Sequence, residues 1–207
     1  YDNMLDTTVR SSFANQGQIC LCGSRIFIEA SIYEQFKTDF VKRIQALKVG
    51  HPSEASTHIG ALVSKPHLEK VQEYINIAKE EDGKILCGGN KVTVEGYENG
   101  YYLEPTVIEV KTDDCRVNQE EIFGPVVTIM PFNSEDDVLQ MANKVKYGLS
   151  ATLWTNNLKR TMRLSNQLQA GIVWVNTWMM RDLRTPFGGV KASGVGREGG
   201  FEALRFF

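Results

Sequence analysis

Apolar and polar residues alternate along this chain with two different periods, which predicts helices and short strands in turn. A period near 3.6 marks the expected helices, at residues 2–16, from 31 to about 50, at 66–81, from 134 onward and at 158–168. Short runs rich in β-branched and aromatic residues mark the expected strands, at residues 25–28, 84–87, 106–110, 126–131, 150–154 and 171–175.

Two serines carry the pattern of helix N-caps. Ser31 is followed three residues later by Glu34, which predicts a capping box. Ser134 precedes three consecutive acidic residues, where the helix dipole favours negative charge. The run 126–131 is apolar throughout, which is typical of a strand buried on both faces.

This alternation of strands and helices predicts an α/β fold with an open, largely parallel sheet flanked by helices. The chain has no internal repeat, no low-complexity segment and no linker that would divide it. We therefore expect one domain over residues 1–207.

The composition argues against a disordered, nucleic-acid-binding, membrane-spanning or disulfide-rich protein. The chain is 42% hydrophobic and 23% charged with a formal net charge of −2, so it is neither disordered nor basic enough for a nucleic-acid footprint. No apolar run approaches the roughly 18 residues that a membrane helix needs. Four cysteines do not make a disulfide framework, so a cytoplasmic location, without nucleic-acid or membrane partners, is expected.

The first candidate for chemistry is the segment 15–22, Asn-Gln-Gly-Gln-Ile-Cys-Leu-Cys. Its cysteines could be small packing residues, because free cysteine usually behaves as a buried hydrophobe. They are poorly spaced as metal ligands, and no metal site is expected. The alternative is a nucleophilic thiol on a tight turn, where backbone N–H groups stabilise an oxyanion. Spacing alone does not choose between these readings.

Two further clusters follow. Residues 119–125, Gln-Glu-Glu-Ile-Phe-Gly-Pro, lead into the most apolar strand; they are either a solvated acidic loop or a ligand site at a strand end. Residues 186–198 hold several glycines, which suits either a phosphate-binding loop or a surface loop.

Taken together, the three clusters resemble the aldehyde dehydrogenase superfamily. They occur in the family's order and at about its spacing, and the segments 143–149 and 171–176 match as well. The resemblance covers essentially the whole chain and implies the fold of the family's catalytic domain.

The resemblance also implies roles for individual residues. Cys20 is the nucleophile, which forms a thiohemiacetal with an aldehyde and then a thioester that water hydrolyses to a carboxylate. Glu121 binds the nicotinamide ribose of NAD and Phe123 packs beside it; NADP stays open as the cofactor. Phe187 is expected in the substrate tunnel. Ile19 and Leu21 flank the nucleophile, and Cys22 is not expected to be catalytic.

The segment 176–184 lies where the family shapes its substrate pocket, and it is similar to dehydrogenases of 2-aminomuconate and 2-hydroxymuconate semialdehydes. Trp178 is expected to line this pocket. Because these substrates carry a carboxylate far from the aldehyde, Arg181 or Arg184 is expected to clamp it through a planar guanidinium. The alternative is a surface arginine paired with Asp182, with a simple aliphatic or aromatic aldehyde as the substrate.

The chain departs from the family pattern in what it lacks. It has no Glu-Leu-Gly-Gly-type motif for the general base and no Rossmann glycine loop, and the family's oligomerisation strand is not found. We therefore expect a catalytic-domain fragment, inactive alone, whose full-length parent is a homodimer or homotetramer. Two other hypotheses stay open: a relative that acylates coenzyme A, and a non-catalytic protein that keeps the fold.

Overall fold

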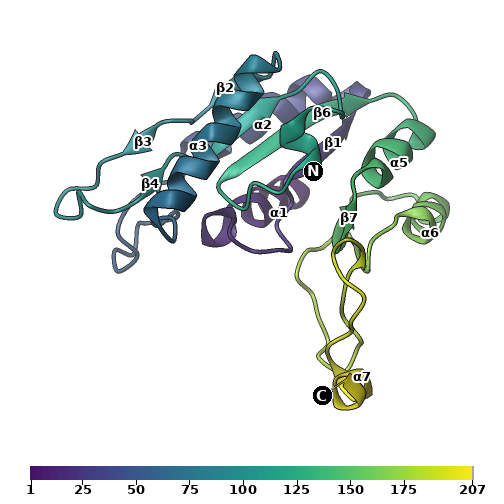
Figure 1. Cartoon of the computed structure of the whole chain (residues 1–207). Helices are drawn as coiled ribbons and strands as arrows, with labels where there is room; N and C mark the ends of the chain where they lie inside the picture. The colour runs from purple at the N-terminus through teal and green to yellow at the C-terminus, as the bar shows by residue number, and fades with distance from the viewer. Residues whose placement is uncertain (207) are drawn as a thin grey trace. The chain divides into compact units, whose positions relative to one another are not determined.

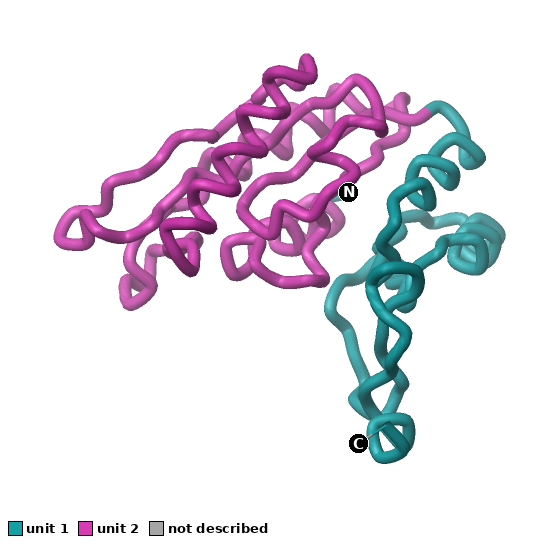
Figure 2. Tube along the Cα trace, in the orientation of Figure 1, with its two compact units in different colours: residues 1, 133–207 teal, residues 2–132 magenta. Residues whose placement is uncertain are grey.

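The computed structural model describes residues 1–206. These separate into two compact units: unit 2 is Asp2–Phe132, and unit 1 is Tyr1 with the described part of Asn133–Phe207 (Figure 2). The assignment of residues 1–207 to one catalytic domain stays a prediction.

Unit 2 is built on a four-stranded sheet with the order β1-β6-β5-β2. The strands are β1 (Arg25–Glu29), β6 (Val126–Phe132), β5 (Thr106–Glu109) and β2 (Lys84–Cys87). β6 pairs in parallel with both β1 and β5, and only β2 is antiparallel. The predicted α/β class with a largely parallel sheet is therefore confirmed, and the apolar run 126–131 is a central strand.

Helices cover both faces of this sheet (Figure 1). α1 (Asp2–Phe13) and α2 (Tyr33–Gln45) pack on one face, where Phe13 and Phe40 join Val107, Val127 and Ile129 in the core. α3 (Lys65–Glu80) covers the other face, and the short α4 (Arg116–Gln119) packs against α3. The alternation of side chains along β5 and β6 explains why both faces of these strands are apolar.

Several predicted helix boundaries need correction, among them the end of α2, which lies at Gln45 and not near Gly50. The first helix ends at Phe13, and a 3-10 turn, η1 (Ala14–Gly17), follows it. Ser31 does not cap α2: it lies within the 3-10 turn η2 (Ala30–Ile32), and its hydroxyl donates to the Glu29 carboxylate at 3.3 Å. Because this local bond uses the serine side chain, α2 begins at Tyr33 without a side-chain cap.

α3 begins one residue earlier than expected, after Ser64, whose hydroxyl accepts from the backbone N–H of His67. The loop between β2 and β5 contains a small antiparallel pair, β3 (Lys91–Val92) and β4 (Tyr102–Leu103), which the sequence pattern did not indicate. Two-residue strands are too short to show a period of two.

Unit 1 contains two small sheets. β8 (Ser150–Leu153) and β9 (Ile172–Val175) are parallel and joined through α6 (Leu158–Gln167), whereas β7 (Tyr147–Gly148) and β10 (Val190–Lys191) are antiparallel. α5 (Glu135–Lys144) has the predicted Ser134 cap, completed as a capping box by Asp137. The last described helix is α7 (Gly200–Phe206). No helix in residues 1–206 is long and apolar enough to cross a membrane.

Candidate active site

The parallel pairing of β1 with β6 brings two of the three sequence motifs to one end of the sheet. The Cys20 segment leads into β1, and the Glu121–Phe123 segment leads into β6. Neighbouring parallel strands begin at the same edge of a sheet. The two motifs therefore meet at the amino ends of the strands, whereas ligands of open α/β sheets usually bind at the carboxyl ends.

The two motif loops also touch directly through glycines. A Cβ atom placed on Gly17 would lie 2.1 Å from the carbonyl oxygen of Gly124. Gly17 is buried and has φ +70°, a conformation that glycine adopts without strain. Both the close approach to Gly124 and the positive φ therefore require a glycine at the base of the Cys20 loop.

The backbone before the nucleophile is left-handed over three consecutive residues. Asn15 has φ 48° and Gln16 has φ 57°, ahead of Gly17. Each non-glycine residue in this region costs about 1–2 kcal/mol. The asparagine offsets part of this cost, because its amide donates to the Gln18 carbonyl at 3.1 Å while the Gln18 N–H donates to the Asn15 carbonyl at 2.9 Å.

Cys20 lies on a tight turn in which the Cys22 N–H donates to the Ile19 carbonyl at 2.9 Å. Its side chain is exposed, and in the described part of the chain no acceptor is found for its backbone N–H. Leu21 is buried and Ile19 is half-buried. The turn thus offers a thiol and a free backbone donor to solvent.

Cys22 has a different environment. Its thiol is half-buried and donates to the Ala14 carbonyl at 3.8 Å. Burial raises the pKa of Cys22 to about 11, so it stays protonated and unreactive near neutral pH.

The structure separates the two neighbouring glutamates of the second motif. Glu120 accepts from the Tyr74 hydroxyl at 2.7 Å and from Arg116 Nε at 2.9 Å. Glu121 is exposed, and within residues 1–206 its carboxylate has no partner. Glu121 is therefore the carboxylate that remains available to a ligand.

Phe123 is held in a left-handed conformation, φ 62°, with about a third of its surface exposed. Two side chains of α3 hold this turn: His67 Nε2 lies 2.7 Å from the Phe123 carbonyl, and Lys70 donates to the Glu121 carbonyl at 3.0 Å. The His67 ring also meets the Phe123 ring edge-on. These contacts support an exposed aromatic residue in a conformation that it would not adopt by itself.

The remaining candidates lie in unit 1, where the structure distinguishes the two arginines. The Arg181 guanidinium stacks on the Phe187 ring, 4.0 Å from its centroid, and donates from Nη2 to Glu198 at 3.0 Å. Its side chain is only 23% exposed. Its Nε and Nη1 atoms have no acceptor among the described residues. A planar donor edge on an aromatic ring suits a carboxylate.

Arg184 has a different arrangement. Its side chain is 89% exposed, and its Nε donates to both oxygens of Asp182, at 2.9 and 3.1 Å. This is the surface pairing with Asp182 that the sequence left open as an alternative. Trp178 is buried, with 8% of its surface accessible.

The glycine-rich segment 186–198 ties unit 1 together. Phe187 and Glu198 exchange backbone hydrogen bonds of 2.7 Å in both directions. Lys191 donates to the carbonyls of Asn143 and Val145, and the Ser193 hydroxyl accepts from the Gly148 N–H at 2.9 Å. These polar groups stabilise the fold of unit 1. The segment is nevertheless largely exposed, with Val195 at 94%, as the surface-loop interpretation expects, and the phosphate-binding interpretation stays a prediction.

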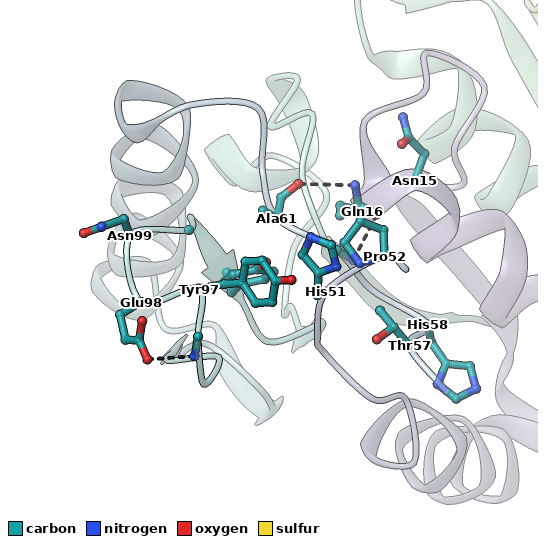
Figure 3. Close-up of a pocket in the computed structure, with 14 residues that line it drawn as sticks. Asn15, Gln16, His51, Pro52, Thr57, His58, Ala61, Tyr97, Glu98 and Asn99 are labelled. Atoms are coloured by element: carbon teal, nitrogen blue, oxygen red, sulfur yellow. Dashed lines mark hydrogen bonds between the residues drawn. The ribbon is translucent and has the colours of Figure 1, made fainter. Parts of the chain in front are cut away.

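A cavity of about 740 Å³ lies in unit 2 beside the start of the nucleophile segment (Figure 3). Asn15 and Gln16 form part of its wall, and His51 stacks on Tyr97 with ring centroids 3.8 Å apart. Cys20, Glu121 and Phe123 do not line it. Residues 1–206 contain no group of three or more His, Cys, Asp or Glu side chains suited to a metal ion.

Sequence reasoning did not identify four side chains that support this site, namely Gln16, Gln18, His67 and Lys70. The glutamines were visible in the Gln-Gly-Gln pattern, but nothing in it showed their partners. His67 and Lys70 share a helix face three residues apart, a spacing that any surface helix provides.

A comparison with protein-family models matches residues 1–207 to the aldehyde dehydrogenase family. Among curated proteins, the 2-aminomuconic semialdehyde dehydrogenase of Bos taurus is 52% identical over 98% of this chain and 42% of its own length. The 2-hydroxymuconic semialdehyde dehydrogenase of Pseudomonas putida is 41% identical over all of this chain and 43% of its own length. The chain thus spans less than half of these relatives.

Solved structures of aldehyde dehydrogenases also match this chain. The crystal structure of a betaine aldehyde dehydrogenase from Staphylococcus aureus in complex with NAD⁺ matches with a TM-score of 0.96 and 34% identity. This match covers all of the present chain and 41% of the solved one.

Proposed function

Because the chain belongs to the aldehyde dehydrogenase family, we propose that it provides the nucleophile-bearing part of an enzyme that oxidises an aldehyde to a carboxylate with NAD. The observation that carries the proposal is Cys20, an exposed thiol on a turn whose backbone N–H is free, next to a loop that presents an unpaired carboxylate and an aromatic ring.

The chemistry of the chain's own residues follows from this geometry. The Cys20 thiolate attacks the carbonyl carbon, so that a C–S bond forms and the carbonyl electron pair moves to oxygen. The Cys20 N–H, which has no acceptor in the described residues, donates to this oxyanion. Loss of hydride from the former carbonyl carbon leaves a thioester on Cys20. Water then releases the carboxylate and regenerates the thiol.

The cofactor-side residues fit a nicotinamide nucleotide. A free carboxylate such as Glu121 accepts hydrogen bonds from the paired hydroxyls of a ribose, and the exposed Phe123 ring offers an apolar surface beside it. NAD, when bound, supplies the hydride acceptor. Among the described residues, Glu121 and Phe123 are those that we assign to holding it.

For the substrate, we assign a semialdehyde with a distal carboxylate, of the muconic type for which the two curated relatives are named. Arg181 is the clamp that the contacts favour, because it keeps two unpaired donors and is half-buried on Phe187. The Nε and Nη2 atoms of Arg184 already donate to the Asp182 carboxylate, and its side chain is exposed. Phe187 supports the clamp, and Trp178, Ile19 and Leu21 stay assigned to substrate binding, as the sequence suggested.

The test uses the full-length enzyme that carries this chain, with NADH production followed at 340 nm. We expect turnover of 2-hydroxymuconate semialdehyde, a weaker reaction with hexanal, and no reaction with either substrate in the Cys20→Ala variant. Cys22→Ala is the matched control and keeps its activity, because that thiol is protonated and turned inward. Full activity in Cys20→Ala would refute the proposal.

A further inference from the structure

The side chain of Gln16 joins the nucleophile segment to a distant part of unit 2 (Figure 3). Its carbonyl oxygen accepts from the Gly60 N–H at 3.2 Å, and its amide nitrogen donates to the Ala61 carbonyl at 3.3 Å. One amide thus satisfies a donor and an acceptor of two successive residues, as a neighbouring strand would.

Gln18 adds a third hydrogen bond to the same segment, residues 60–63. Its side-chain oxygen accepts from the Val63 N–H at 3.1 Å. The segment that receives these bonds is itself anchored, since the Leu62 N–H donates to the Tyr101 carbonyl at 2.9 Å and the Gly50 N–H donates to the Ile59 carbonyl at 3.0 Å. The two glutamines therefore attach residues 16–18 to a fixed support.

These contacts surround a backbone that would not be stable alone. Asn15 and Gln16 are left-handed without being glycine, and Cys20 follows only four residues after Gln16. On the other side, Gly17 lies against the backbone of Gly124. If the bonds of Gln16 and Gln18 were both absent, Gly124 would support the segment from one side only.

We propose that Gln16 is a positioning residue for the nucleophile: its paired hydrogen bonds to Gly60 and Ala61 hold the Cys20 turn in the conformation that presents the thiol. Gln18 assists through Val63. The inference rests on the proposed function for its effect on turnover, but the conformation of the turn can be measured without any substrate.

The experiment compares three variants of the full-length enzyme. Gln16→Met keeps the length of the side chain and loses two hydrogen bonds, and Gln18→Met loses one. Asn143→Leu is the matched control, because Asn143 also donates to one backbone carbonyl, of Gln167, and accepts from a nearby N–H, of Gln169, but it lies in unit 1. The readouts are kcat, the KM for NAD⁺, the melting temperature and the rate at which iodoacetamide alkylates Cys20, located by mass spectrometry.

We expect Gln16→Met to lower kcat by about 10-fold to 100-fold, because small displacements of a reacting group have effects of this size. Cys20 alkylation without cofactor should slow by at least about threefold, since thiol reactivity depends on its immediate surroundings. The KM for NAD⁺ should change less than about twofold. Gln18→Met should show the same pattern more weakly, which keeps the test valid if Gln16→Met does not fold.

The control should lose melting temperature without slowing alkylation. If Gln16→Met and Gln18→Met both alkylate at the rate of Asn143→Leu, the positioning role is refuted. If alkylation slows as expected but Cys20→Ala keeps full activity, the proposed function fails while the role of Gln16 in holding the turn stands.

Discussion

At the scale of single residues, two side chains of the same type that are close in the sequence differ in their contacts and therefore in the role that we assign to them. Cys20 is exposed, whereas Cys22 is held by the Ala14 carbonyl. Glu121 is free, whereas Glu120 is bound by Tyr74 and Arg116. In each pair, the residue assigned to function is the one that the fold leaves without a partner.

The same reasoning predicts different outcomes for the two arginines. Arg181→Ala should raise the KM for a carboxylated semialdehyde by about 10-fold to 100-fold, which corresponds to the loss of about 1.5–3 kcal/mol from a charged hydrogen bond. Arg184→Ala, the matched control, should change the KM by less than about twofold, because Arg184 is exposed and pairs with Asp182. Steady-state kinetics with hexanal complete the test, and equal losses on both aldehydes in Arg181→Ala would contradict the clamp.

At the scale of elements, the site depends on two parallel strands that begin side by side. β1 and β6 place the segments before Arg25 and Val126 at one edge of the sheet, and the contact of Gly17 with Gly124 joins them there. The geometry of the nucleophile loop is therefore coupled to that of the Glu121–Phe123 turn.

Gly17→Ala should destabilise the protein by about 2–5 kcal/mol, from the strain of a positive φ together with overpacking against the Gly124 carbonyl. Gly96→Ala is the matched control: Gly96 has φ +77°, but a Cβ there would meet nothing within 4 Å. Gly96→Ala should destabilise the protein only through the strain of the positive φ, by about 1–2 kcal/mol. Urea denaturation measures the loss of unfolding free energy in each variant. Equal losses in Gly17→Ala and Gly96→Ala would show that the contact between the two loops is not tight.

The stability that ion pairs between α5 and α6 contribute should depend on pH. Hydrogen bonds from Arg163 and Arg160 lower the pKa of Glu135 below its usual value. A carboxylate with a lowered pKa in the folded state stabilises the fold above its unfolded pKa of about 4.3, and this contribution is lost as the pH falls through the folded pKa.

Glu135→Gln should therefore be less stable than the unmodified protein in urea at pH 7, and this difference should be smaller at pH 3, which lies below the unfolded pKa. Glu202→Gln is the control, because among the described residues the partner of Glu202 is the exposed Arg205 on the same helix. It should have little effect at either pH. A Glu135→Gln difference as large at pH 3 as at pH 7 would mean that the ion pairs are not its cause.

At the scale of the whole molecule, the elements were predictable where a strong local pattern decides them. The apolar run 126–131 and the acidic turn after Ser134 became β6 and the capped α5. Ser31 shows the limit: its capping pattern was present, but the hydroxyl binds Glu29 nearby. Local hydrogen bonds of this kind compete with a cap, and a sequence does not show which one forms.

The candidate site shows the same limit. Cys20 and Glu121 could be proposed as site residues from short motifs, but the two arginines could not be separated. Asp182 lies between them in the sequence, and only the structure shows that it pairs with Arg184. The bonds from Gln16 to Gly60 and Ala61 span more than 40 residues, as their separations of 44 and 45 show. No period along the chain encodes contacts of that range.

In the proposed reaction, Cys20 forms the covalent bond to the substrate. The most direct test of this bond is a single turnover of the full-length enzyme with NAD⁺ and 2-hydroxymuconate semialdehyde, quenched in acid within milliseconds and analysed by peptide mass spectrometry. We predict that the peptide containing Cys20 gains the mass of the acyl group, with the modification on Cys20 and none on Cys22. Consumption of the aldehyde with an unmodified Cys20 at every quench time, or an acyl group on another residue, would contradict the account.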